Sequence, residues 1–235
     1  MAKKIVAARQ QSGNAEKEAQ IQTIATLSSS ITHEIKNYLA AISICAELSE
    51  RQLSNIRGRV KTADYLISNL QLQIKEVISG KPDTKDFKQH SIAKNIEEAL
   101  EQYPFKESER ELIALDLSQD FSYFGNSVLT NHILFNLTKN ALRAIENAGK
   151  GTITIKLKPE KDFNKLVFTD TATGVAKEFL PKMFKLFESQ STAQGGTGIG
   201  LAFCKLIMQS YGGDIVCDPV EGEYTEFTLT FPCLL

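Results

Sequence analysis

The sequence contains no tryptophan, three histidines, four cysteines and no long apolar run. Lysine and arginine together number 27 against 28 for aspartate and glutamate, so no basic excess suggests nucleic-acid binding. No stretch approaches the ~18 apolar residues of a membrane-spanning helix, and the opening MAKKIVAARQQSG lacks a signal-peptide core. We therefore expect a cytoplasmic globular protein. If it serves a membrane receptor, the membrane segment is absent from this chain.

The cysteines show no paired spacing of the kind that binds a metal. Each lies among apolar residues, so we expect reduced thiols in a protein core at Cys45, Cys204, Cys217 and Cys233. With 42% hydrophobic residues, a chain of 235 residues is long enough for one or two domains with real cores.

The first third of the sequence is predicted to be helical. Residues 1–15 are polar and aperiodic, which is typical of a linker or a frayed coil. Residues 16–80 read as two helices that reverse near Gly58. The second carries apolar residues at alternating spacings of three and four, namely Val60, Ala63, Ile67, Leu70, Ile74 and Val77. Dimerisation into a four-helix bundle would bury these stripes, although packing on the other domain of the same chain is an alternative.

The segment SGKPD, residues 79–83, is expected to break the helix and mark a domain boundary. For residues 84–235 the pattern predicts an α/β sandwich, with one mixed sheet and helices on one face. The expected elements are a helix capped by Ser91, a strand ELIALDL, a helix from Asn126 to Gly149, strands GTITIKLKP and KLVFTDT, a helix IGLAFCKLIMQSYGG, and a hairpin of DIVCD and TEFTLTF.

One histidine stands apart on the first predicted helix. With about 100° per residue, His33 lies about 200° from Ile31, which is at the centre of the apolar stripe. Asn37 lies beside it, and Glu34 lies at the edge of the same face. A histidine placed there can meet a ligand, a metal or another domain. A solvent-facing histidine without a role is the alternative.

Polar residues also share one side of the helix that begins at Asn126. They are spaced four, four and three apart, as His132, Asn136, Asn140 and Arg143. Amide oxygens and a guanidinium suit a phosphate-bound Mg²⁺ ion, because the ion takes few protein oxygens and arginine neutralises phosphate. An ordinary solvated helix face is the alternative.

Two glycine-containing segments complete the set. Asp170 ends a predicted strand, where its carboxylate can accept a hydrogen bond from an exocyclic amine, and Gly174 would let the backbone approach a planar ring. In QGGTGIGL, glycines run directly into a helix, whose free N–H groups form an anion site. The spacing fits neither a Walker loop nor a dinucleotide-binding fingerprint. A purely structural glycine turn is the alternative.

Taken in order, HEIKN, NLTKNALRAI, DTATG, MFKLF and GGTGIGL resemble the H box, N box, first glycine box, F box and second glycine box of sensor histidine kinases of two-component systems. The resemblance runs from about residue 20 to 232. It implies a dimerisation and histidine-phosphotransfer domain at residues 16–80, followed by a Bergerat-type ATP-binding domain at residues 84–235.

The resemblance also implies roles for individual residues. His33 would accept the γ-phosphate of ATP, Glu34 would act as its general base, and Asn37 would orient water for dephosphorylation. Asn140 would bind Mg²⁺, and Asp170 would bind the adenine amine. The remaining ATP-binding positions implied are Asn136, Arg143, Gly174, Gly196, Thr197, Gly198 and Gly200.

A lid over the phosphates is expected at residues 188–197, anchored by Phe184 and Phe187. The implied partners are a second copy of the chain and the receiver domain of a response regulator. Small apolar residues on the exposed side of the first helix, Ala40, Ala41 and Ile44, are a candidate docking surface for that domain. Packing against the second helix or the dimer mate is the alternative.

The sequence departs from the family pattern in three places. Tyr38 replaces the usual proline after the H box, and Ala172 replaces a glycine and would crowd the nucleotide slightly. The lid contains no lysine or arginine, so Arg143, Lys185 or the metal would have to meet the γ-phosphate charge. Two other functions are possible for such a chain. An ATP hydrolase would have a water-activating glutamate at the position of Asn136, so Asn136 argues against it. A nucleotide-gated scaffold without kinase activity would not need the HEIKN segment, so the presence of HEIKN argues against it.

Overall fold

The computed structural model describes residues 72, 73, 75, 76, 79, 80, 82–189 and 198–234, all within one compact unit, Gln71–Leu235. The predicted four-helix bundle, apart from its last residues, lies outside this set. The described residues of 72–79 are helical. The Gly80 amide donates to the Glu76 carbonyl oxygen at 3.1 Å, and Gly80 has a φ of 64°. This left-handed cap confirms that the helix breaks at SGKPD.

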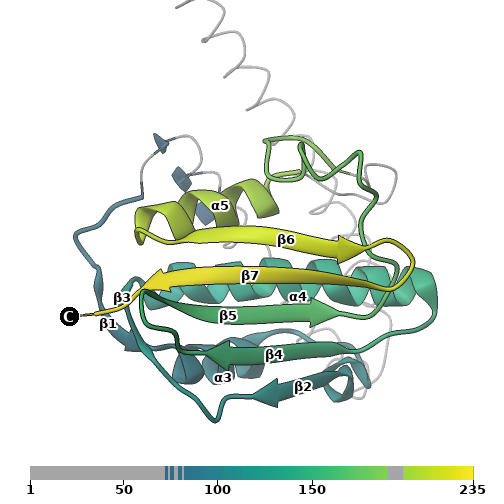
Figure 1. Ribbon diagram of the computed structural model, residues 1–235, viewed down its shortest axis with the longest axis horizontal. Coiled ribbons are helices and arrows are strands. Elements are labelled where there is room, and N and C mark those ends of the chain that lie inside the picture. Colours follow the sequence, from purple (N-terminus) through teal and green to yellow (C-terminus); the bar gives the residue numbers. More distant parts are fainter. Residues whose placement is uncertain (1–71, 74, 77–78, 81, 190–197, 235) are drawn as a thin grey trace, which may run out of the picture. The chain divides into compact units, whose positions relative to one another are not determined.

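Five strands form the main sheet in the order β2-β4-β5-β7-β6 (Figure 1). Strands β2 and β4 are parallel and the other neighbours are antiparallel, so the predicted mixed sheet is confirmed. The bounds are β2 Ile113–Asp116, β4 Ile153–Lys158, β5 Phe163–Asp170, β6 Asp214–Val220 and β7 Tyr224–Pro232. The strand predicted at ELIALDL starts late, because a 3₁₀ helix, η1, occupies Glu109–Leu112.

Three helices cover one face of this sheet: α3 (Ile92–Gln102), α4 (Ser127–Ala148) and α5 (Gly200–Ser210) (Figure 1). The sheet meets them with every second residue, as in β4, where buried and exposed side chains alternate. The predicted caps are confirmed. Ser91 accepts from the Lys94 amide, Asn126 accepts from two amides of the first turn of α4, and Gly149 ends α4 at a φ of 64°.

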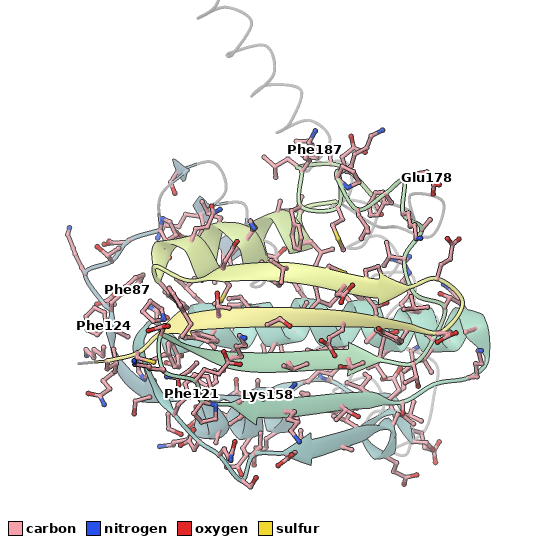
Figure 2. All side chains as sticks on the ribbon, in the orientation of Figure 1. Phe87, Phe121, Phe124, Lys158, Glu178 and Phe187 are labelled. Carbon is pink, nitrogen blue, oxygen red and sulfur yellow. The ribbon has the colours of Figure 1, made fainter. Side chains whose placement is uncertain are left out.

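A second sheet was not predicted. It consists of β1 (Lys88–Ser91) and β3 (Ser122–Gly125), paired antiparallel. Four residues each are too few for a visible alternation in the sequence. Phe87, just before β1, packs edge-on against Phe124 of β3 and against Tyr211 at the end of α5, with ring centroids 6.2 and 5.2 Å apart (Figure 2). The segment that enters the domain is therefore fixed by aromatic contacts.

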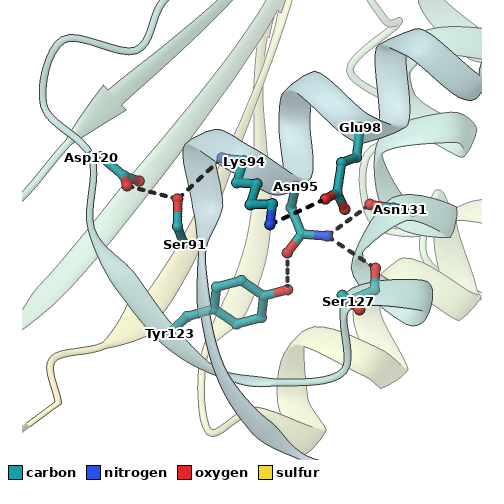
Figure 3. Close-up of polar contacts among 8 residues, drawn as sticks. All are labelled: Ser91, Lys94, Asn95, Glu98, Asp120, Tyr123, Ser127 and Asn131. Atoms are coloured by element: carbon teal, nitrogen blue, oxygen red, sulfur yellow. Dashed lines mark hydrogen bonds and ion pairs between the residues drawn. The ribbon is translucent and has the colours of Figure 1, made fainter.

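A buried hydrogen-bond network connects this second sheet to α3 and α4 (Figure 3). The Tyr123 hydroxyl donates to Asn95 Oδ1 at 2.8 Å, and Asn95 Nδ2 donates to the Ser127 carbonyl oxygen at 3.2 Å. Because buried polar groups are costly unless paired, this network fixes how the start of α4 sits on α3.

The cysteine prediction is confirmed for the free thiol state of the three described cysteines, but its core placement is correct for only one of them. Cys204 of α5 is fully buried, as expected, and burial raises the pKa of its thiol. Cys217 and Cys233 are half-buried, because one lies on the edge strand β6 and the other follows β7. All three of these cysteines are free thiols, and Cys45 lies outside the described residues.

Candidate nucleotide site

The polar stripe of α4 divides into a buried half and an exposed half. His132 and Asn136 are buried, whereas Asn140 is exposed and Arg143 is half-buried. An ordinary solvated face is therefore wrong for the first two residues. The opposite side packs into the core as predicted, with Ile133, Leu134 and Leu137 almost fully buried.

Asn136 is a point where three segments meet. Its Nδ2 donates to the His132 carbonyl oxygen at 2.9 Å, and its Oδ1 accepts from Gln73 Nε2 at 3.2 Å. At Gly200, the first residue of α5, an added Cβ would lie 2.7 Å from Asn136 Oδ1. The predicted N box and second glycine box are thus in contact, and any side chain at position 200 would press on the Asn136 amide.

His132 is kept neutral by its surroundings. It is 9% exposed, and its Nδ1 atom has no hydrogen-bond partner in the part of the chain that the structure describes. Burial lowers the pKa of His132 from its ordinary 6.5 to about 4. The Phe135 ring lies edge-on to the imidazole with centroids 5.7 Å apart. A neutral imidazole here is a packing group at neutral pH.

This burial predicts how stability depends on pH. Between pH 6.5 and about 4 the unfolded chain binds a proton at His132 that the folded chain does not. The free energy of unfolding should therefore fall with acidification, by up to ~1.4 kcal/mol per pH unit from this residue. Circular dichroism of urea unfolding at pH 7.0, 6.0 and 5.0 measures the slope.

The control for this prediction is His132→Leu, which should flatten the decline between pH 6.5 and 5. Burial raises the pKa of Asp170, so that carboxyl contributes the opposite sign: it increases the free energy of unfolding as pH falls through its folded pKa towards the unfolded value of 3.8. The comparison of wild type with His132→Leu cancels this term. Parallel pH profiles for the two proteins would contradict the assignment to His132.

Asp170 lies at the end of β5 on the helix-covered side of the sheet and is 3% exposed. Its Oδ1 accepts from the Ala172 amide at 3.2 Å, and its carboxyl also has a side-chain hydrogen bond with Thr225 of β7. These contacts fix the direction of the carboxylate. Thr225 was not predicted, because only the antiparallel pairing of β5 with β7 places it opposite Asp170.

Gly174 is required by the protein's own backbone. Its φ is 64°, and a Cβ there would lie 2.2 Å from the Val220 carbonyl oxygen at the end of β6. The neighbouring Thr173 carbonyl accepts from the Gly222 amide at 2.7 Å. The loop after Asp170 is thereby attached to the turn between β6 and β7. Close approach to a ring stays a prediction, beside this structural reason for the glycine.

Gly198 has a similar explanation. At a φ of 64°, an added Cβ would lie 2.5 Å from the Phe187 carbonyl carbon, and the Phe187 amide donates to the Gly198 carbonyl oxygen at 3.0 Å. Phe187 itself is 37% exposed, so its backbone makes this contact. Gly196 and Thr197, with most of the predicted lid, lie outside the described residues.

Phe184 contacts a lysine that no sequence motif had singled out. Lys205 of α5 places its Nζ 5.3 Å from the centre of the Phe184 ring. The same Nζ pairs with Asp214 Oδ1 at 2.6 Å and donates to the Ile215 carbonyl oxygen at 3.1 Å. Lys205 therefore connects the F box to α5 and β6, and its charge is already compensated.

Two further cations, Arg143 and Lys185, differ from Lys205 in having no ion-pair partner among the described residues. Ala172, which replaces a glycine of the family pattern, is fully buried, and its methyl group is covered by protein atoms.

The predicted catalytic residues of the first helix, His33, Glu34 and Asn37, lie outside the described residues.

Residues 125–234 match the family model described as "Histidine kinase-, DNA gyrase B-, and HSP90-like ATPase". These residues belong to that ATPase family. The match confirms the predicted ATPase-like sandwich and agrees with ATP as the expected nucleotide. A bound Mg²⁺ stays a prediction: no group of three or more His, Cys, Asp or Glu side chains among the described residues could hold a metal ion.

Two curated relatives extend the similarity to almost the whole chain. The autoinducer 1 sensor kinase/phosphatase LuxN of Vibrio campbellii is 32% identical over 230 residues, covering 92% of this chain and 27% of LuxN. The CAI-1 autoinducer sensor kinase/phosphatase CqsS of Vibrio cholerae is 26% identical, covering 92% of this chain and 34% of CqsS. The resemblance to sensor histidine kinases is thereby confirmed. The chain spans about a third or less of these relatives.

A solved structure agrees with the fold. The catalytic domain of the histidine kinase ThkA superposes with a TM-score of 0.52 at 24% identity, covering 63% of this chain and 95% of that domain. No helix among the described residues is long and apolar enough to cross a membrane.

Proposed function

We propose that this chain is an ATP-dependent protein-histidine kinase of two-component signalling. It transfers the γ-phosphate of ATP to His33 and then to the receiver domain of a response regulator. The observation that carries the proposal is the contact of Asn136 with Gly200, which joins the N box to the second glycine box in an ATPase domain. The HEIKN segment supplies the acceptor histidine.

The residues of the domain fit a magnesium nucleotide. Asp170 presents a fixed, buried acceptor for the adenine amine, Asn140 offers an exposed amide oxygen to the metal, and Arg143 and Lys185 lie free of ion pairs among the described residues. Bound Mg²⁺ would screen the charge on the phosphates. Catalysis in this domain is then mostly positioning and charge neutralisation.

The acceptor step uses the first helix. The Nε2 lone pair of His33 forms a bond to the γ-phosphorus as the bond to the ADP oxygen breaks, and Glu34 takes the Nδ1 proton. Asn37 would orient water in the reverse dephosphorylation, which the names of LuxN and CqsS as kinase/phosphatases support.

The proposed organisation keeps three parts. Residues 1–15 form a linker, residues 16–80 a dimerisation and phosphotransfer hairpin within a four-helix bundle, and residues 84–235 the ATP-binding domain. The heptad spacing of the second predicted helix supports a homodimer.

Two other functions are less well supported. An ATP hydrolase of the gyrase or chaperone type would need a carboxylate to activate water, and Asn136 offers an amide whose two ends are already hydrogen-bonded. A nucleotide-gated scaffold would bind ATP without phosphorylating itself. Incubation of the full chain with γ-labelled ATP and Mg²⁺ separates the three. Acid-labile, alkali-stable label supports the kinase, released phosphate the hydrolase, and binding alone the scaffold.

Partner docking has its own prediction. If Ala40, Ala41 and Ile44 receive the response regulator, Ile44→Glu should block transfer from phosphorylated kinase to the receiver while sparing autophosphorylation, because a buried charge opposes apolar contact. Both reactions are measured on the same labelled preparation. Loss of both activities, or of neither, contradicts this docking surface.

A further inference from the structure

The helix that precedes the ATPase domain buries two polar side chains against it. Gln73 is 4% exposed and Glu76, three residues later on the same helical face, is 5% exposed. Buried polar residues are costly unless they find partners. Gln73 Nε2 donates to Asn136 Oδ1 at 3.2 Å across 63 residues of sequence. The helix end is thus tied by a buried hydrogen bond to the N box.

The Asn136 amide is used at both ends. Its Nδ2 donates within α4 to the His132 carbonyl, and its Oδ1 accepts from Gln73 while Gly200 packs close to the same atom. A phosphate would need an N–H donor from this amide, and a metal would need Oδ1. Either ligand therefore meets an amide whose orientation is set by Gln73.

We propose that Gln73 and the nucleotide compete for the Asn136 amide, so that Gln73 is a positioning residue that sets nucleotide affinity. The inference rests on the proposed function, which places Asn136 near the phosphates. Linkage makes the effect reciprocal. Bound nucleotide weakens the binding of residues 72–76 to the rest of the domain, and displacement of these residues raises the affinity for nucleotide. The position of residues 72–76, at the end of the second phosphotransfer helix, is thereby coupled to occupancy of the nucleotide site.

The test is nucleotide affinity in the full chain. Gln73→Met keeps the length and burial of the side chain and removes its donor. The dissociation constant for Mg-AMPPNP, measured by calorimetric titration, should fall about 2- to 10-fold, which is the range that one net hydrogen bond allows. A hydrogen bond with a purely structural role stabilises the free and bound protein equally and leaves this constant unchanged.

The matched control is Glu76→Gln, which changes a polar residue on the same buried face that has no hydrogen bond to Asn136. An equal change in both variants, or unchanged or weaker binding in Gln73→Met, overturns the competition. Gln73→Ala replaces Gln73→Met should the latter fail to fold. Failure of the wild-type chain to bind Mg-AMPPNP at all would instead refute the proposed function.

A second measurement needs no variant. Saturating Mg-AMPPNP should speed amide hydrogen exchange in residues 72–76 of the wild-type chain, because those residues lose a buried anchor. Exchange that is unchanged or slowed by the nucleotide contradicts the proposal.

Discussion

Replacing His33 with glutamine is expected to abolish all acid-labile labelling by γ-labelled ATP while leaving the affinity for Mg-AMPPNP unchanged. Glutamine keeps a polar side chain of similar reach but has no nucleophilic nitrogen, so the phosphoryl group has no acceptor. Nucleotide affinity should persist, because every residue proposed to bind ATP lies in the second half of the chain. The measurements are phosphoimage density after denaturing gels and calorimetric titration of the same samples.

The small number of histidines makes this experiment decisive. The chain has three, His33, His90 and His132. The imidazole of His132 is buried against Phe135. The imidazole of His90 lies tilted against the Tyr123 ring within the second sheet, with ring centroids 5.7 Å apart. His90→Gln is therefore the matched control and should keep full labelling. Label that survives in His33→Gln but disappears in His90→Gln would move the acceptor to β1.

The base can be separated from the nucleophile. Glu34→Gln should lower the initial rate of labelling by about 10²- to 10⁴-fold without removing the final label, because general-base assistance changes the rate of transfer and not its chemistry. A variant without any label over long incubation would mean that Glu34 also positions His33.

Local signals predicted most of the fold. Ser91 and Asn126 cap their helices as their side chains allow, and the alternation in β4 follows from one face packing on helices. The four-residue strands β1 and β3 were not predicted, because they are strands through their pairing with each other and show no pattern of their own in the sequence. Glycine roles needed the tertiary structure: Gly174 approaches Val220, and Gly198 approaches Phe187.

The site was predicted as residue types but not as contacts. Helical spacing grouped Asn136 with Asn140, yet packing of α5 buries the first and leaves the second exposed. Gln73 and Thr225 had no signal, since each reaches the site through a partner distant in sequence. Such residues follow from the arrangement of helices and strands, which no local window contains.

Replacing Asp170 with asparagine is expected to weaken ATP binding strongly. The Asp170 carboxylate is held by the Ala172 amide and Thr225, and it is proposed to accept a hydrogen bond from the adenine amine. Asp170→Asn keeps the size of the side chain. Because the Ala172 amide is a donor, the asparagine oxygen should face Ala172, and its NH₂ group then points towards the adenine amine. Two donors then face each other. Loss of a hydrogen bond to a charged group should weaken ATP binding about 10- to 100-fold.

The base preference separates this effect from unfolding. Guanine carries an acceptor where adenine carries its amine, so the asparagine NH₂ should suit GTP better, and the ratio of GTP to ATP affinity should rise in Asp170→Asn. The substitution also removes a buried carboxyl whose pKa is raised by burial, so stability at neutral pH should not fall. Asp116→Asn is the control: Asp116 lies on β2, where it forms an ion pair with Lys156 of β4, and the variant should bind ATP normally. Unchanged ATP affinity in Asp170→Asn, with the fold intact, would place the adenine elsewhere.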